Sequence, residues 1–128
     1  EPDRFGHKFY PLPVTTLDTA LRKLSHYPQV TVMVEIKEES LRHWGVSKVM
    51  DSLLNRLAAH NGKCVLISFS YEALLYARNH SAMDIGWVLR EYDETRRQRA
   101  QTLAPEYLIC NQDKLPRNKA PWTGARWV

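Results

Sequence analysis

The sequence predicts an α/β fold in which short parallel strands alternate with helices. Four apolar runs, at 30–37, 64–69, 85–89 and 107–110, have the length and the β-branched character of buried strands. The segments between them carry apolar residues at intervals of three and four, as on one face of a helix. The runs are centred about 20 to 30 residues apart, which is the spacing of successive strand–helix units.

The chain is expected to open with a loop and a helix. Residues 1–14 include three prolines and show no regular apolar period, which indicates a loop. The helix that follows has Thr15 or Thr16 as its N-cap, and Asp18 in its first turn suits the helix dipole. Pro28 ends this segment, because the residue before a proline avoids the helical conformation.

A strand and a long helix form the next unit. Residues 30–37 are apolar at both alternating positions until Glu35, which predicts a strand covered on both faces. Residues 41–59 carry apolar side chains on one helical face, and we expect a helix that stops at Asn61-Gly62.

The unit then repeats towards the C-terminus. The expected elements are strand 64–69, helix 71–79, strand 85–89, helix 93–103 and strand 107–110. The last segment contains two prolines and ends, at 126–128, in what we expect to be the start of a further strand. Two architectures fit, an open doubly wound sheet and a segment of a closed barrel. No GxGxxG or Walker loop follows a strand, which disfavours the nucleotide-binding versions.

The composition fits a single globular domain, residues 1–128, with 44% hydrophobic and 25% charged residues. No apolar run approaches the ~20 residues of a membrane span. The net charge of +4 is spread along the chain, so we expect a solvated surface and no nucleic-acid partner. Cys64 and Cys110 sit in apolar runs, which favours buried free thiols in a reducing cytoplasm over a disulfide.

Chemistry is expected where the parallel strands end, because functional groups of α/β proteins gather at the carboxyl ends of their strands. None of the five histidines ends a predicted strand, and no Ser-His-Asp order is apparent. Trp44 and Trp122 are the tryptophans that could face a pocket. Three strand ends carry polar or aromatic candidates, namely Glu35 with Lys37, Ser68 with Phe69, and Asn111 with Asp113.

Glu35 and Lys37 are the most informative pair. Their spacing of two places both side chains on one side of the strand. A carboxylate can hold a hard divalent cation and an ammonium can hold a phosphate, so together they suit a metal-bound phosphate. An internal ion pair, or two side chains that point to solvent at a strand end, fits the same spacing.

Four segments also resemble one enzyme family in their order and spacing. They are VEIK at 34–37, LISF at 66–69, GWVL at 86–89 and PEYL at 105–108, preceded by the helix start PVTTL. Together they resemble the glycerophosphodiester phosphodiesterases, and the RFG start and the WTG ending are similar to a bacterial branch of that family. The resemblance covers residues 4–128.

The resemblance implies a partial (β/α)8 barrel, the TIM barrel, with strands four to seven and the start of strand eight. It implies that Glu35 is a ligand of a divalent metal, Mg2+ or Ca2+, that Lys37 contacts the phosphate, and that Phe69 lines the substrate side. The implied activity is metal-dependent hydrolysis of glycerophosphodiesters, small-molecule substrates of lipid and glycerol metabolism, to glycerol 3-phosphate and an alcohol.

The chain departs from the family pattern in its catalytic groups. The His-Arg-Gly of strand one, the Glu-x-Asp of strand two and the His-Asp pair of strand three are absent, and Gly6-His7-Lys8 belongs to the expected loop. The histidines of these two motifs, on strands one and three, are the family's general acid and base. We therefore expect the C-terminal half of a cytoplasmic enzyme, without the catalytic histidine pair and with little or no activity alone.

Half a barrel has open sheet edges. Unpaired edges invite pairing with another chain, so a homo-oligomer or a swapped dimer is expected. The sequence alone leaves one alternative open, a non-catalytic α/β interaction module that kept the scaffold.

Overall fold

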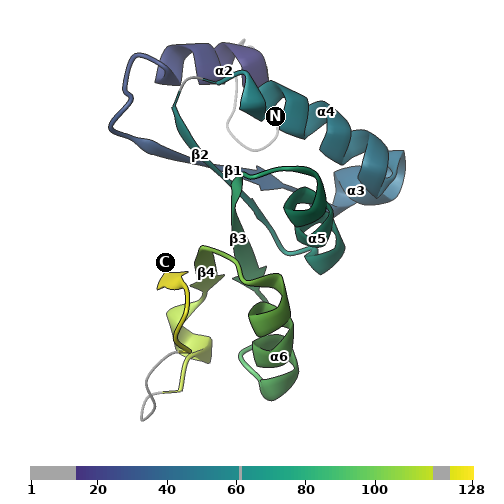
Figure 1. Cartoon of the computed structure of the whole chain (residues 1–128), viewed down its shortest axis with the longest axis vertical. Helices are drawn as coiled ribbons and strands as arrows, with labels where there is room; N and C mark the ends of the chain where they lie inside the picture. The colour runs from purple at the N-terminus through teal and green to yellow at the C-terminus, as the bar shows by residue number, and fades with distance from the viewer. Residues whose placement is uncertain (1–13, 61, 117–121) are drawn as a thin grey trace, which may run out of the picture.

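The computed structural model describes residues 14–60, 62–116 and 122–128, so the predicted N-terminal loop lies outside them apart from Val14. Five strands form one sheet in the order β1-β2-β3-β4-β5, and every neighbouring pair is parallel (Figure 1). The predicted parallel α/β fold is confirmed. The strands are β1 (Thr31–Ile36), β2 (Lys63–Ser68), β3 (Asp84–Leu89), β4 (Tyr107–Cys110) and β5 (Arg126–Trp127). The helices are α2 (Leu17–Leu24), α3 (Glu38–Trp44), α4 (Val46–Ala58), α5 (Tyr71–His80), α6 (Glu94–Leu103) and the 3-10 helix η2 (Gln112–Lys114).

The strand order decides between the two architectures that the sequence leaves open. A doubly wound sheet reverses its strand order and carries helices on both faces. Here each strand lies beside its predecessor, and right-handed crossovers in one direction place all their helices on one face. Leu66, Ile85, Trp87 and Leu108 share that face by register and lie in the core, so we name it the covered face. The sheet is therefore part of a barrel wall.

Helix α2 forms as the sequence predicts. Thr16 is its N-cap, and the Thr16 hydroxyl accepts a hydrogen bond from the Thr19 amide at 3.3 Å. Asp18 lies in the first turn, and its carboxylate pairs with Arg56 of α4. The buried side chain of α2 is Leu21, which anchors the helix in the core.

Strand β1 differs from the prediction that both of its faces are covered, and that prediction is wrong. Its burial alternates, with every second residue from Thr31 exposed and the residues between them half-buried. Met33, for example, is 36% exposed. The cause is the one-sided helix layer, which leaves the other face of this edge strand without cover in the described residues.

The long helix predicted over 41–59 is two helices, α3 and α4. They meet at Gly45, whose φ of 82° and ψ of 147° suit glycine and strain other residues. Helix α3 also begins earlier than predicted, at Glu38, directly after β1. Helix α4 ends at Ala58, and Asn61 of the predicted stop lies outside the described residues.

The core lies between the helices and the covered face of the sheet. Met50 of α4, Leu74 of α5 and Leu66 of β2 are fully buried there. Burial of each such side chain contributes about 1.5–3 kcal/mol. Cys64 and Cys110 are free thiols, as predicted, although each is half-buried, and burial raises the pKa of both thiols.

The opposite face of the sheet, which we name the open face, is apolar without a helix packed on it in the described residues. Val65, Ile67, Val88 and Ile109 belong to it by register. A Cβ added to Gly86 would lie 2.9 Å from Ile67 Cγ2, so glycine lets the neighbouring side chains close over this position. Ile67, Val88 and Ile109 are nevertheless half-buried, so this face is only partly covered.

We predict that the chain self-associates through its open face and its free edges. Among the described strands, β1 and β5 each have one neighbour, and the exposed Met33 lies on the β1 edge. Light scattering over a range of concentrations should give a mass that rises above the 14.9 kDa of one chain. Met33→Lys should shift the mass towards the monomer, because a charge on an edge opposes pairing. A monomer at every concentration would contradict this prediction.

Arg78 of α5 and Glu106 form a clamp at the N-terminal ends of the strands. Arg78 Nη2 lies 3.0 Å from Glu106 Oε2 and also donates to the Ala104 carbonyl at 2.7 Å. Glu106 Oε2 accepts a second hydrogen bond, from the Ile85 amide, at 2.8 Å. Partial burial raises the pKa of the Glu106 carboxyl, but the hydrogen bonds from Arg78 and Ile85 outweigh it and hold the pKa below its ordinary value.

We predict that Glu106→Gln lowers the free energy of unfolding by about 1 kcal/mol at pH 7, allowing for solvent at a side chain that is one-third exposed. Because the folded-state pKa is lowered, the stabilisation is present above the unfolded-state pKa. It is lost as the pH falls through the folded-state pKa. Urea unfolding at pH 7 and near pH 3 should therefore show that the difference in unfolding free energy between the unchanged chain and Glu106→Gln becomes smaller at the lower pH. The control is Glu94→Gln, because Glu94 forms an exposed pair with Arg97, and it should leave the unfolding free energy unchanged. Equal unfolding free energies for Glu94→Gln and Glu106→Gln would contradict the clamp.

Candidate functional site

The carboxyl ends of the parallel strands meet at one edge of the sheet, which we name the mouth. Glu35 is the penultimate residue of β1 and Lys37 lies just beyond the strand, while Phe69 follows β2, Arg90 follows β3 and Asn111 follows β4. In barrel proteins this end carries the active site. The mouth therefore defines where this chain presents its candidate functional groups.

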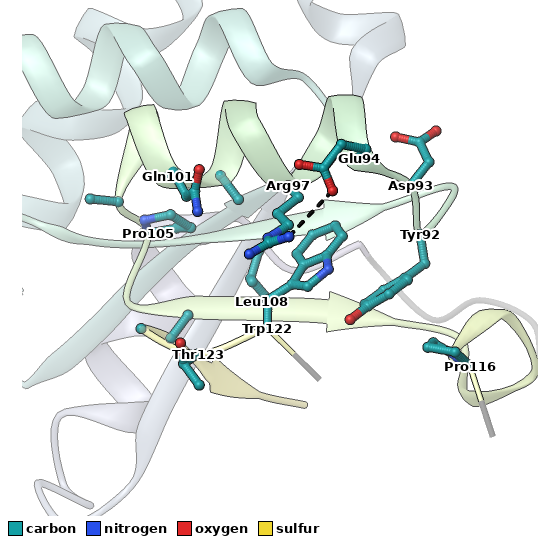
Figure 2. A pocket seen from close by; sticks show the side chains of 14 residues that line it. Tyr92, Asp93, Glu94, Arg97, Gln101, Pro105, Leu108, Pro116, Trp122 and Thr123 are labelled. Carbon is teal, nitrogen blue, oxygen red and sulfur yellow. Dashed lines mark hydrogen bonds and ion pairs between the residues drawn. The ribbon is translucent and has the colours of Figure 1, made fainter. Parts of the chain in front are cut away.

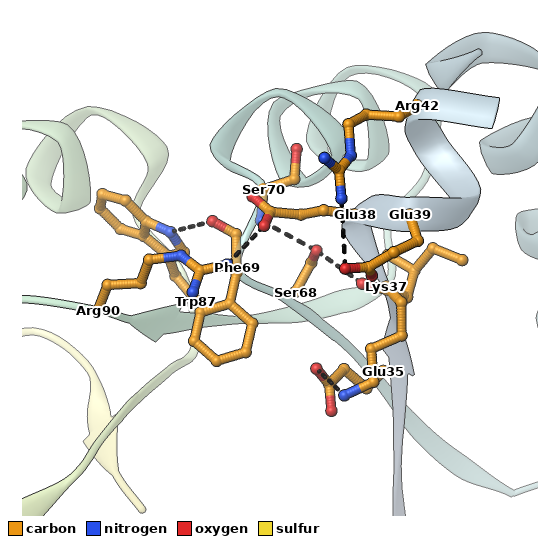
Figure 3. A network of polar contacts seen from close by, with 11 residues as sticks. Glu35, Lys37, Glu38, Glu39, Arg42, Ser68, Phe69, Ser70, Trp87 and Arg90 are labelled. Carbon is orange, nitrogen blue, oxygen red and sulfur yellow. Dashed lines mark hydrogen bonds and ion pairs between the residues drawn. The ribbon is translucent and has the colours of Figure 1, made fainter. Parts of the chain in front are cut away.

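The Glu35 and Lys37 side chains lie on the same side of the chain, as their spacing predicts. Lys37 Nζ donates a hydrogen bond to Glu35 Oε1 at 2.8 Å (Figure 3). The Lys37 side chain is 63% exposed and the Glu35 side chain 29%, so a ligand can reach both. The spacing also allowed an internal ion pair or two side chains that point to solvent. The structure has an ion pair, and this pair is accessible to solvent.

Ser68 holds the ends of β1 and β2 together. It is fully buried, and its hydroxyl donates to the Ile36 carbonyl at 3.0 Å and accepts from the Ser70 amide at 3.0 Å. The Ser70 hydroxyl in turn accepts from the Ala73 amide and caps α5. Phe69 sits between these two serines, so its backbone is fixed at the mouth.

Arg90 lies against Phe69 and is the mouth residue that the sequence did not single out. Its Cζ lies 4.4 Å from the centre of the Phe69 ring, and its Nη2 donates to Glu38 Oε2 at 2.5 Å (Figure 3). The signal in the sequence was its place directly after strand 85–89. The link to Glu38 spans 52 residues and needs the tertiary structure.

The remaining polar candidates, Asn111 and Asp113, lie in the turn that follows β4. The Asn111 side chain accepts from the Asp113 amide at 3.0 Å, which caps η2. Lys114 pairs with Glu91 at 2.8 Å. The Asn111 side chain therefore has a structural role in this turn, and Asp113 contributes its backbone amide to it.

Whether the mouth can bind a divalent cation depends on the oxygen ligands that its residues offer. Mg2+ and Ca2+ take six or more oxygen ligands. Glu35 offers a carboxylate whose neighbour is the Lys37 ammonium, and no group of three or more His, Cys, Asp or Glu in the described residues could hold a metal ion. The described residues therefore do not make a complete metal site, and a cation at Glu35 needs oxygen ligands from outside them.

A cavity of about 740 Å3 lies between α6 and the segment before β5 (Figure 2). Trp122, one of the two tryptophans that the sequence predicts could face a pocket, lines this cavity. Its ring stacks on Tyr92, with the ring centroids 4.2 Å apart. Trp44 is 57% exposed instead. Leu108 of the covered face forms part of the cavity floor, so the cavity belongs to the helix side of the sheet.

The fold and the mouth define a class of protein, the (β/α)8 barrels, of which this chain has part of the wall. Comparison with solved structures finds a phosphodiesterase from Oleispira antarctica in complex with the product sn-glycerol-3-phosphate. The match has a TM-score of 0.72 and 20% sequence identity, and it covers 87% of this chain and 45% of that chain. No protein-family model and no curated protein matches.

This likeness confirms the predicted fold, a partial barrel similar to part of a phosphodiesterase. The chain spans slightly less than half the length of the structure that it matches. In the described residues, no helix is long and apolar enough to cross a membrane.

We predict that Ser68→Ala destabilises the mouth. The change leaves the Ile36 carbonyl and the Ser70 amide without their buried partner, which costs about 1–3 kcal/mol. Urea unfolding should show that loss, and hydrogen exchange should quicken at the amides around Phe69. Ser47→Ala, on an exposed position of α4, is the control. Equal stability of the two variants would contradict the role given to Ser68.

Proposed function

We propose that this chain forms the C-terminal half of a phosphodiesterase barrel that hydrolyses glycerophosphodiesters to glycerol 3-phosphate and an alcohol. One observation carries the proposal. Glu35 and Lys37 emerge together at the mouth, in a fold shared with a phosphodiesterase solved with sn-glycerol-3-phosphate. An acid beside an amine at this edge suits a cation-bound phosphate.

Each mouth residue has a proposed role. Glu35 provides one oxygen ligand for Mg2+ or Ca2+, which would supply Lewis-acid activation of the phosphate once other ligands complete its site. Lys37 exchanges the Glu35 carboxylate for a phosphate oxygen when substrate binds. Phe69 presents an apolar ring to the substrate, and its backbone is held for that purpose by Ser68 and Trp87, whose Nε1 donates to the Phe69 carbonyl at 3.3 Å.

The groups that transfer protons are proposed to lie on the other half of the barrel. None of the mouth residues named above is a histidine. Positioned acid and base groups contribute about 10²–10⁴-fold to such a reaction. The chain alone is therefore proposed to bind and orient substrate without turning it over.

A cytoplasmic location is part of the same proposal. The support is that Cys64 and Cys110 are free thiols, as in a reducing compartment.

A non-catalytic α/β interaction module is the second candidate. The observation that favours it is the pairing of Glu35 with Lys37, which neutralises the carboxylate that a cation would need. Metal titration separates the two candidates, because a module should bind Mg2+ or Ca2+ no better at Glu35 than at any exposed acid.

We predict that Glu35→Gln impairs metal binding and activity in a polypeptide that contains the remaining barrel strands. The amide removes one anionic ligand, so calorimetry should show at least a tenfold weaker affinity for Mg2+ or Ca2+. Release of glycerol 3-phosphate should fall by at least as much.

Glu39→Gln is the matched control, because Glu39 is an exposed acid of α3 paired with Arg42. It should leave both quantities unchanged. Unchanged metal affinity and activity in Glu35→Gln would remove Glu35 from the site. Robust metal-dependent turnover by the 128-residue chain alone would contradict the proposed division between the two halves.

A further inference from the structure

Arg90 is held at the mouth more firmly than an exposed arginine usually is. Its guanidinium stacks on Phe69, in the closest cation–π contact of the described residues, and it is anchored at one edge by Glu38. Its backbone is held as well, since Lys114 Nζ donates to the Arg90 carbonyl. Yet the Arg90 side chain remains 60% exposed.

Among the other exposed arginine pairs, Arg56 of α4 also reaches a second element, Asp18 of α2, but the pairs within a single helix have a different character. Arg42 pairs with Glu39 and Arg97 with Glu94, each three residues away on its own helix. Such pairs are local and add at most a few tenths of a kcal/mol. Arg90 instead joins the ends of β3 and β2 to the first turn of α3, and so it is oriented by three separate elements.

An arginine oriented in this way is suited to bind an oxyanion. A guanidinium carries five N–H donors in a rigid fork, which matches a carboxylate or a phosphate. Within the described residues, its hydrogen bond to Glu38 uses one nitrogen, Nη2. Phe69 covers one flat side, and because the side chain is 60% exposed, other parts of it are open to solvent at the mouth.

Arg90 and Lys37 flank Phe69 from opposite sides. They follow β3 and β1, which are the two neighbours of β2 in the sheet. Adjacent strands are about 4.8 Å apart, so the two cationic residues start from backbones about 10 Å apart. Both side chains are long, so a single ligand that carries two anionic groups can contact both.

We propose that Arg90 is a second oxyanion-binding side chain, which selects ligands whose alcohol part carries a carboxylate or a phosphate of its own. Lys37 binds the first oxyanion, the phosphate of the diester, and this part rests on the function proposed above. Arg90 binds the second oxyanion through the free edge of its fork. The substrate class is therefore glycerophosphodiesters with an anionic alcohol part.

The test measures binding to the unmodified chain by NMR titration at fixed ionic strength, with three probes. In each probe the single organic group of the monoester stands for the alcohol part of the diester. The probe sn-glycerol 3-phosphate has one oxyanion, 3-phosphoglycerate adds a carboxylate, and glycerol 1,3-bisphosphate adds a phosphate. The second oxyanion should tighten binding about fivefold and shift the Arg90 Nε–H resonance. A gain with both probes means that Arg90 accepts either group, and a gain with one identifies the group it selects.

Arg90→Gln should abolish this gain, and Arg90→Lys should restore part of it by returning the charge without the fork. Arg97→Gln, which removes an equal charge from α6, should retain the full gain. The proposal is overturned when Arg90→Gln and Arg97→Gln show the same gain. Lys37→Gln separates the two proposals, because unchanged affinity for sn-glycerol 3-phosphate in that variant counts against the proposed function and leaves the Arg90 comparison intact.

Discussion

The direction of the strand connections constrains everything else in this structure. Every neighbouring pair of strands is parallel and every strand lies beside its predecessor, so each right-handed crossover returns on the same face. The helices therefore bury one face of the sheet and leave the other apolar and open. The same constraint brings all the carboxyl ends to one edge, where Glu35, Lys37, Phe69 and Arg90 meet although the sequence separates them.

The charges at the mouth are balanced by pairs that a ligand can exchange. Lys37 is paired with Glu35 and Arg90 with Glu38. Exposed pairs of this kind are worth about 0–1 kcal/mol, so replacing a carboxylate by a ligand oxyanion costs little. The pairs keep the cations oriented before a ligand arrives. Phe69 and Ser68 add the rigid support, since neither can move without breaking a buried contact of β1 or β3.

Patterns that are local in the sequence predicted their structures well. The apolar run at 107–110 forms β4 with the predicted boundaries. The spacing of two between Glu35 and Lys37 correctly predicted that their side chains lie on the same side of the chain. Periodicity could not show which face would be covered, which is why β1 was assigned two covered faces. A single glycine in a helical pattern is often tolerated, so the break at Gly45 was not apparent. The sequence did not indicate Arg90 as a candidate, because its orientation comes from the contact with Phe69, and that contact depends on the register of β2 and β3.

The position of Glu35 connects metal binding to the closure of the barrel. Glu35 lies on β1, which has β2 as its one neighbour in the described sheet. Whatever closes the barrel on this side must therefore pair with the free edge of β1. In the proposed enzyme, a strand pairs with the free edge of β1, and the further oxygen ligands of a cation at Glu35 come from the other half of the barrel. Barrel closure is then the condition for assembly of the cation site, because Glu35 alone cannot complete it.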